Sequence, residues 1–216
     1  MNMRDMWRLT VLRGIARLVL PIINKMYTIA LGVKSLGGSS SLICVELRRH
    51  EGEAVTLSDG CRVRPGDPVI KLHLNGAWFD EQEEQRSASQ PAGFPRGVTR
   101  YFRDGFKLLA TQVADGRYGG VIAVYGWTVL HGPARRLGFQ VMELPNTLRI
   151  RIALSYIAGL MQIYRLPWVK RYRASRRPLR IKAVWLSRAD LLKMYRSYAV
   201  PFVHLFLFHQ VVGKIV

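Results

Sequence analysis

The stretch GDPVIKLHLNGAWF (residues 66–79) decides the class of fold, because apolar and polar side chains alternate through its centre. Such a period of two places successive side chains on opposite faces of a β-strand. One face then carries Ile70, Leu72 and Leu74, and the other carries Val69, Lys71, His73 and Asn75. The stretch therefore predicts a strand over 69–75 with one apolar face and one polar face.

A second stretch, ICVELRRH (43–50), repeats this alternation and places Glu46 on its polar face. If the two strands are neighbours in the sheet, Glu46 and His73 could form an acid–base pair. Without such a pairing, His73 is an ordinary histidine on the solvated side of a sheet. The residues alone leave both interpretations open.

Further elements alternate along the chain. Runs rich in β-branched and aromatic residues predict strands over 41–50, 118–132, 139–144 and 183–187. Helices are expected over 98–115, 145–166 and 188–197, with Ser187 capping the last, and a short helical turn over 133–138. This order favours an α+β fold: a single domain with a mixed or antiparallel sheet packed by helices, plus basic amphipathic terminal helices.

The two ends of the chain differ from its middle. Residues 1–38 are predicted to form an N-terminal amphipathic helical segment, with a helix over 4–31 that Pro21 kinks. Residues 39–197 would form the α+β domain, and residues 198–216 an apolar C-terminal segment.

The charge of the chain is strongly positive and uneven. Lys and Arg number 33 against 14 acidic residues, a formal net charge of +19. Residues 151–216 alone carry 13 basic residues and one acidic residue, which gives +12. A surface of this kind attracts anionic partners such as a membrane, a glycan or a nucleic acid.

The basic segment RLPWVKRYRASRRPLRIK (165–182) concentrates this charge, with eight basic residues and no acid. The residues expected to bind an anionic surface are Lys170, Arg171, Arg173, Arg176, Arg177 and Arg180. Anionic membrane is favoured because the amphipathic segment 4–31 and the apolar segment 198–216 could lie in the same interface. An anionic glycan fits the same charge, and nucleic acid ranks lower because no recognisable reading module is present.

Each of these segments also has a plainer interpretation. The basic segment could be a solvated connector. Residues 198–216 could dock as a helix on the core or form the interface of a homodimer. No run reaches the roughly 18 apolar residues that a membrane-spanning helix needs. No signal peptide is convincing, and Cys44 and Cys61 are expected as reduced thiols, so we expect a cytoplasmic chain, peripheral to the inner face of the plasma membrane.

His131 is the second candidate for chemistry. It lies near the end of the predicted strand 118–132, before a helical turn, where functional groups are common. Trp127 lies four residues earlier, and an imidazole beside an indole could bind sugar. The alternative is a strand terminus beside a core tryptophan. The ligand-binding candidates are Trp127, Asn75, Arg48 and Arg136, and the catalytic candidates are His73, His131 and Glu46.

Known catalytic and cofactor motifs are missing from the chain. It has no GxxxxGK[ST], no GxGxxG after a strand, no GxSxG and no HExxH. No CxxC or His/Cys cluster indicates zinc. Asp59 and Asp67 could together form a cation site, but aspartates in turns more often cap those turns. The sequence therefore predicts no cofactor and no metal site.

Three segments carry a resemblance to a known family. They are VELRRHEGEAVTLSDGCRVRPGDPVIKLHLN (45–75), GWTVLHGPARRLGFQVMEL (126–144) and VWLSRADLL (184–192). Together they resemble the YkoP-like domain of Firmicute bacteria over about residues 40–190. That domain occurs alone or fused behind a polysaccharide-deacetylase domain, so the resemblance implies an association with cell-envelope glycans.

The resemblance reaches two candidate residues and departs at a third. His73 stands in the L-H-L element of the family and His131 in its L-H element. Relatives carry an acid after L-H-L, where this chain has Asn75, so a carboxylate is missing at that position. The chain also lacks the motifs of a deacetylase domain, and that activity is not carried over.

The expected function is therefore an accessory or binding protein of bacterial cell-envelope polysaccharide metabolism at the inner membrane surface. One alternative is a transferase or hydrolase acting on a glycan or nucleotide sugar through His73, His131 and Glu46. A second alternative is a nucleic-acid-binding protein.

Overall fold

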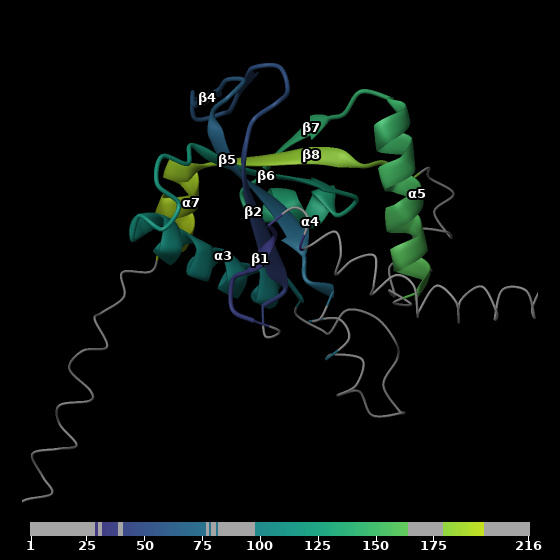
Figure 1. The fold of residues 1–216 in the computed structure, drawn as a ribbon, viewed down its shortest axis with the longest axis horizontal. Helices are drawn as coiled ribbons and strands as arrows, with labels where there is room; N and C mark the ends of the chain where they lie inside the picture. The colour runs from purple at the N-terminus through teal and green to yellow at the C-terminus, as the bar shows by residue number, and fades with distance from the viewer. Residues whose placement is uncertain are drawn as a thin grey trace, which may run out of the picture.

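A computed structural model of the chain describes residues 29, 32–38, 41–76, 78, 81, 98–163 and 179–196 (Figure 1). The predicted helix over 4–31 except Ile29, the terminal segment 198–216 and most of the basic segment 165–182 lie outside the described residues.

The described residues form a mixed sheet of six strands with the order β1-β2-β5-β6-β8-β7. Its strands are β1 (Lys34–Ser35), β2 (Ile43–Arg49), β5 (Pro68–Leu74), β6 (Ala123–Thr128), β8 (Lys182–Ser187) and β7 (Gln140–Glu143). Only β5 and β6 pair in parallel among these neighbours; the other pairs are antiparallel. A small hairpin of β3 (Val55–Thr56) and β4 (Arg62–Val63) forms a second sheet. The α+β prediction is confirmed.

The helices of the described residues are α3 (Val98–Ala114), α4 (His131–Arg136), α5 (Leu148–Ile163) and α7 (Arg188–Tyr195). They agree closely with the expected ranges. Ser187 caps α7 as predicted, because its hydroxyl accepts a hydrogen bond from the backbone N–H of Asp190 at 3.0 Å. The predicted strand over 118–132 is wrong at both ends: residues 116–120 form a turn, and His131 opens α4.

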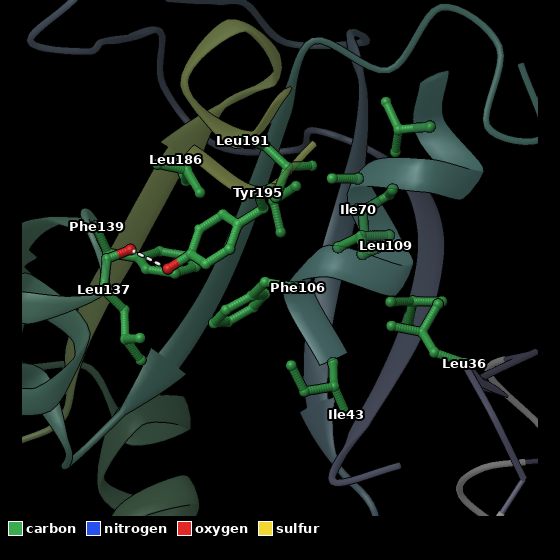
Figure 2. Close-up of a cluster of buried hydrophobic side chains, with 14 of the residues drawn as sticks. Leu36, Ile43, Ile70, Phe106, Leu109, Leu137, Phe139, Leu186, Leu191 and Tyr195 are labelled. Carbon is green, nitrogen blue, oxygen red and sulfur yellow. Dashed lines mark hydrogen bonds between the residues drawn. The ribbon is translucent and has the colours of Figure 1, made fainter. Parts of the chain in front are cut away.

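One face of the sheet packs against α3 and α7 and forms the main core, as Figure 2 shows. Phe106 of α3 lies at its centre, with its ring 5.2 Å from that of Phe139 and 5.3 Å from that of Tyr195. The Tyr195 hydroxyl donates a hydrogen bond to the backbone oxygen of Leu137 at 2.8 Å, so this polar atom is satisfied inside the core. These contacts fix the helices on the apolar face that the alternation in β2 and β5 predicts.

The opposite face of the sheet carries a second apolar cluster. Tyr125 and Trp185 face each other across β6 and β8, and the β3–β4 hairpin contributes Leu57 and Val63. The turns of this hairpin region explain both aspartates: Asp59 accepts from the N–H of Cys61 at 3.0 Å, and Asp67 from the N–H of Arg64 at 2.6 Å. Each caps its own turn, as the more common interpretation predicted.

Two helical glycines provide a matched test of how closely α3 packs on β2. A Cβ atom at Gly105 would lie 2.7 Å from Cδ1 of the buried Ile43, whereas a Cβ atom at Gly132 in α4 meets nothing within 4 Å. We expect Gly105→Ala to lower the free energy of unfolding by about 1–3 kcal/mol through overpacking. Gly132→Ala should raise it by about 0.5 kcal/mol, because alanine favours the helix. Urea unfolding measures the free energy of unfolding of both variants. A loss of stability in Gly132→Ala as large as that in Gly105→Ala would contradict the close packing of α3 on β2.

Candidate functional site

Glu46 lies at the centre of the polar face, on the side of the sheet opposite α3 and α7. Residues of β2 and β5 pair in antiparallel register, with Glu46 opposite Lys71 and Cys44 opposite His73. The Glu46 Oε2 atom accepts a hydrogen bond from His73 Nε2 at 2.8 Å. The condition set by the sequence, that the two strands be neighbours, is met.

Two cations complete what we name the Glu46 cluster: Glu46, Arg48, Lys71 and His73. Lys71 Nζ lies 3.9 Å from Glu46 Oε2, and Arg48 Nη1 lies 3.6 Å from Glu46 Oε1. The Glu46 side chain is only 6% exposed. The sequence predicted a polar face at this point. In the structure the Glu46 carboxylate on that face is buried among three nitrogen-bearing side chains, because each is its neighbour on the same face.

The hydrogen bond to Glu46 fixes the protonation of the His73 ring. A carboxylate can only accept, so His73 Nε2 carries the proton and Nδ1 is left as the basic nitrogen. The pKa of His73 is lowered, chiefly because burial disfavours the charged ring. The positive charges of Lys71 and Arg48 act in the same direction, and Glu46 opposes them. A neutral histidine oriented by a carboxylate is an arrangement suited to accepting a proton.

This lowered pKa has a consequence for stability against pH. The pKa of His73 is lower in the folded protein than in the unfolded chain. Below about pH 6.5 the unfolded chain therefore binds a proton at His73 more readily, so acidification favours unfolding. We expect the free energy of unfolding to fall between about pH 7 and pH 5, and to fall less steeply in His73→Gln. Urea titrations at a series of pH values measure both curves. Parallel curves would show that His73 titrates normally in the folded state.

Aromatic rings border the Glu46 cluster. Lys71 Nζ lies over the ring of Trp127, 5.7 Å from its centroid. Tyr125 stacks on Trp185 with ring centroids 4.7 Å apart, and the ring of His50 lies edge-on to Trp185 with centroids 5.5 Å apart. Charged groups and aromatic rings thus share one face of β2, β5, β6 and β8.

The side chain of Asn75 forms hydrogen bonds with the protein backbone. Its side-chain amide is buried and donates to the backbone oxygens of Gly38 and Ser41 at 3.1 and 2.8 Å. These bonds tie the end of β5 to the connection between β1 and β2. A role for Asn75 in ligand binding stays a prediction.

His131 belongs to a different group of charges from His73. The pKa of His131 is lowered by burial and by the positive charges of Lys182 and Arg135, with Glu143 opposing them. Lys182 forms an ion pair with Glu143 across β8 and β7. The described contacts therefore bring Glu46 and His73 together and place His131 with Lys182 and Glu143.

The remaining predicted residues lie on other elements or outside the described part of the chain. Arg136 is exposed in the last turn of α4, and Arg180 is exposed ahead of β8. The hydrogen bond from Lys182 is the main cause that lowers the pKa of Glu143, and the charge of Arg180 acts in the same direction. Lys170, Arg171, Arg173, Arg176 and Arg177 lie outside the described residues. Among the described helices, none is both long and apolar enough to cross a membrane.

Sequence reasoning missed Lys71 as a member of the site. Its position on the polar face was visible in the alternation, but its place opposite Glu46 depends on the register of β2 against β5. The fold and the Glu46 cluster together define a single α+β domain with a candidate binding site on the face of its sheet opposite α3 and α7.

A comparison with protein families identifies this class of domain. The profile of the YkoP domain matches residues 13–195, which is most of the chain. The chain therefore belongs to the YkoP domain family, as the sequence segments indicated. Comparisons with curated proteins and with solved structures find no match.

Proposed function

We propose that this protein is an accessory or binding protein of bacterial cell-envelope polysaccharide metabolism, held at the inner face of the plasma membrane. The glycan would bind at the Glu46 cluster. The observation that supports this most is the close placement of Lys71 against both the Glu46 carboxylate and the Trp127 ring.

This placement suits a sugar for a chemical reason. Sugars present hydroxyl groups that need both donors and acceptors, and apolar ring faces that pack on aromatic side chains. Lys71 and Arg48 supply donors, Glu46 and His73 supply acceptor atoms, and Trp127 is a half-buried ring beside them. The link to the envelope rests on the association with polysaccharide-deacetylase domains that the family resemblance implies.

Binding of oligosaccharides by the full chain tests the proposal. We expect calorimetry to detect a complex with oligosaccharides of envelope type, and we expect Lys71→Gln to weaken it at least about tenfold, the loss of one hydrogen bond to a charged group. Lys107→Gln makes the same change on α3, where Lys107 is exposed and pairs with Asp104, and should bind like wild type. If wild type binds no oligosaccharide, or if both variants bind alike, the proposed site is wrong.

Membrane attachment is tested separately by co-sedimentation with vesicles. We expect the full chain to bind anionic vesicles, to bind neutral vesicles less, and to lose binding as salt rises. Removal of residues 198–216 should weaken binding if this segment lies in the interface. Equal recovery with anionic and neutral vesicles would contradict the electrostatic attraction, and recovery with neither would remove the membrane from the proposal.

An enzymatic function is the second candidate, favoured by the 2.8 Å hydrogen bond between Glu46 and His73. A neutral histidine oriented in this way could accept a proton from a hydroxyl or from water in glycan transfer or hydrolysis. Product formation from a bound oligosaccharide, lost in a His73 variant that still binds it, would establish turnover.

A further inference from the structure

Helix α5 takes no part in the two apolar clusters of the domain. No described side chain of α5 belongs to the core beneath α3 and α7 or to the cluster beneath the β3–β4 hairpin. Among the described residues, no other helix or strand packs extensively against it. Its sequence, LRIRIALSYIAGLMQI, is nevertheless apolar on most sides. A helix of this composition normally has a partner that covers it.

One face of α5 is exposed and combines apolar side chains with a cation. Leu148 is 72% exposed and Ile152, one helical turn further on, is 61% exposed. Arg151 and Ser155 are exposed on the same side, because residues three and four apart are neighbours on a helix surface. We name this surface the α5 face: Leu148, Arg151, Ile152 and Ser155.

Further cations gather at the end of the sheet from which α5 starts. Glu143 ends β7, a short connection before α5, and forms an ion pair with Lys182, the first residue of β8. Arg180 acts electrostatically on the same Glu143, and Arg135 on His131, which also interacts with Lys182 and Glu143. The group holds three permanent cations and one carboxylate, so its charge is positive. Figure 1 shows α5 at this end of the sheet and α7 at the opposite end.

The partner that fits the α5 face is apolar and anionic at once. Nucleic acid offers phosphates but no apolar layer to cover Leu148 and Ile152. A second copy of the chain would bring its own cations against Arg151, and each chain carries a net charge of +19. The interface of an anionic bilayer supplies both properties, because its acyl chains accept apolar side chains and its headgroups attract basic ones.

We propose that the α5 face binds the surface of an anionic membrane, with Leu148 and Ile152 inserted at the acyl boundary and Arg151 at the level of the headgroups. This inference rests on the membrane attachment in the proposed function and adds the helix that carries it. The helix lies along the interface, since its 16 residues are fewer than the roughly 20 that a spanning helix needs.

The apolar half of the proposal is tested by co-sedimentation of the full chain with phosphatidylcholine vesicles that contain about one-third phosphatidylglycerol. We expect Leu148→Glu combined with Ile152→Glu to lower binding at least about tenfold, because two apolar anchors become charges that the headgroups repel. Leu108→Glu combined with Met194→Glu makes the same change on α3 and α7, where these side chains are 37% and 49% exposed. This control should bind like wild type.

The cationic half is tested by Arg135→Gln combined with Arg180→Gln, two exposed residues. We expect binding to fall about tenfold at low salt and the difference from wild type to shrink as salt rises. Arg188→Gln combined with Lys193→Gln removes two exposed charges from α7 instead, so both variants have the same net charge. The α7 variant should lose clearly less binding, because its charges lie at the opposite end of the sheet.

The outcomes separate this inference from the function on which it rests. Wild type that binds no anionic vesicle contradicts the membrane attachment, and the inference with it. Wild type that binds while the α5 variant binds equally well, or an α5 variant and a control that lose binding alike, overturns the inference and leaves membrane attachment standing. A dimer in sedimentation equilibrium without lipid, abolished by the α5 substitutions, would also overturn it and assign the face to a second copy. Melting temperatures close to that of wild type confirm that the compared variants are folded.

Discussion

Glu46→Gln is expected to lower the free energy of unfolding by about 3 kcal/mol, whereas Glu51→Gln should lower it by less than about 1 kcal/mol. Both glutamates contact the same guanidinium, since Arg48 lies 3.6 Å from Glu46 and 2.6 Å from Glu51. They differ in burial: the Glu46 side chain is 6% exposed and that of Glu51 is 69% exposed.

The difference arises from what each substitution leaves behind. Loss of the Glu46 charge leaves Lys71 and Arg48 close together on a buried face without their shared counter-ion. The cost of an uncompensated buried charge is large, while solvent screens the exposed pair of Arg48 with Glu51.

Urea unfolding at neutral pH and moderate salt measures both variants. Added salt should reduce the difference in stability between wild type and Glu51→Gln, because salt screens the exposed pair, whereas the larger loss in Glu46→Gln should persist, because buried pairs are little screened. Equal losses for the two glutamates would mean that Glu46 is solvated in the folded protein, and the geometry argued for His73 would then lose its basis.

Trp185→Ala is expected to destabilise the fold by about 3–5 kcal/mol, as removal of a large buried aromatic side chain does. Trp185 is 5% exposed, stacks on Tyr125 and packs against the edge of His50. Trp127 lies on the same face, two residues beyond Tyr125 on β6, but is only half-buried. Trp127→Ala should therefore cost clearly less stability.

Substitution of these two tryptophans also distinguishes a role in folding from a role in ligand binding. Trp127→Ala should weaken oligosaccharide binding in a protein that remains folded, because Trp127 is the ring that borders Lys71. Unfolding curves and calorimetric titrations on both variants provide the two readouts. If Trp127→Ala binds the oligosaccharide as tightly as wild type, the indole takes no part in recognition and Trp127 does not belong to the binding site.

The sequence predicted the polar face but not its organisation. Alternation in β2 and β5 reports which side chains share a face, and this placed Glu46 and His73 correctly. Register is a long-range property, set by how strands pair across intervening turns, and it decides that Lys71 stands opposite Glu46. Burial of that carboxylate follows from the same pairing and could not be predicted from single strands.

His131 shows a second limit of the sequence. The run before it contains β-branched and aromatic residues, which favour a strand through residue 132. In the structure β6 ends at Thr128, whose hydroxyl accepts a hydrogen bond from the N–H of Leu130, and the chain turns into α4. This local side-chain bond competes with extended structure, so Trp127 and His131 do not share a strand face.

The placement of core and candidate site on opposite faces of β2 has a consequence for which insertions and deletions the gene can tolerate. Ile43 and Val45 support the helices while Glu46 and Arg48 form the site, so the two sets interleave one residue apart. Loss of a single codon inside this strand would shift every following side chain to the wrong face and damage stability and recognition together. Changes of length are better accommodated at the exposed turns around Gly60 and Gly66, where the shift ends before the next paired strand begins.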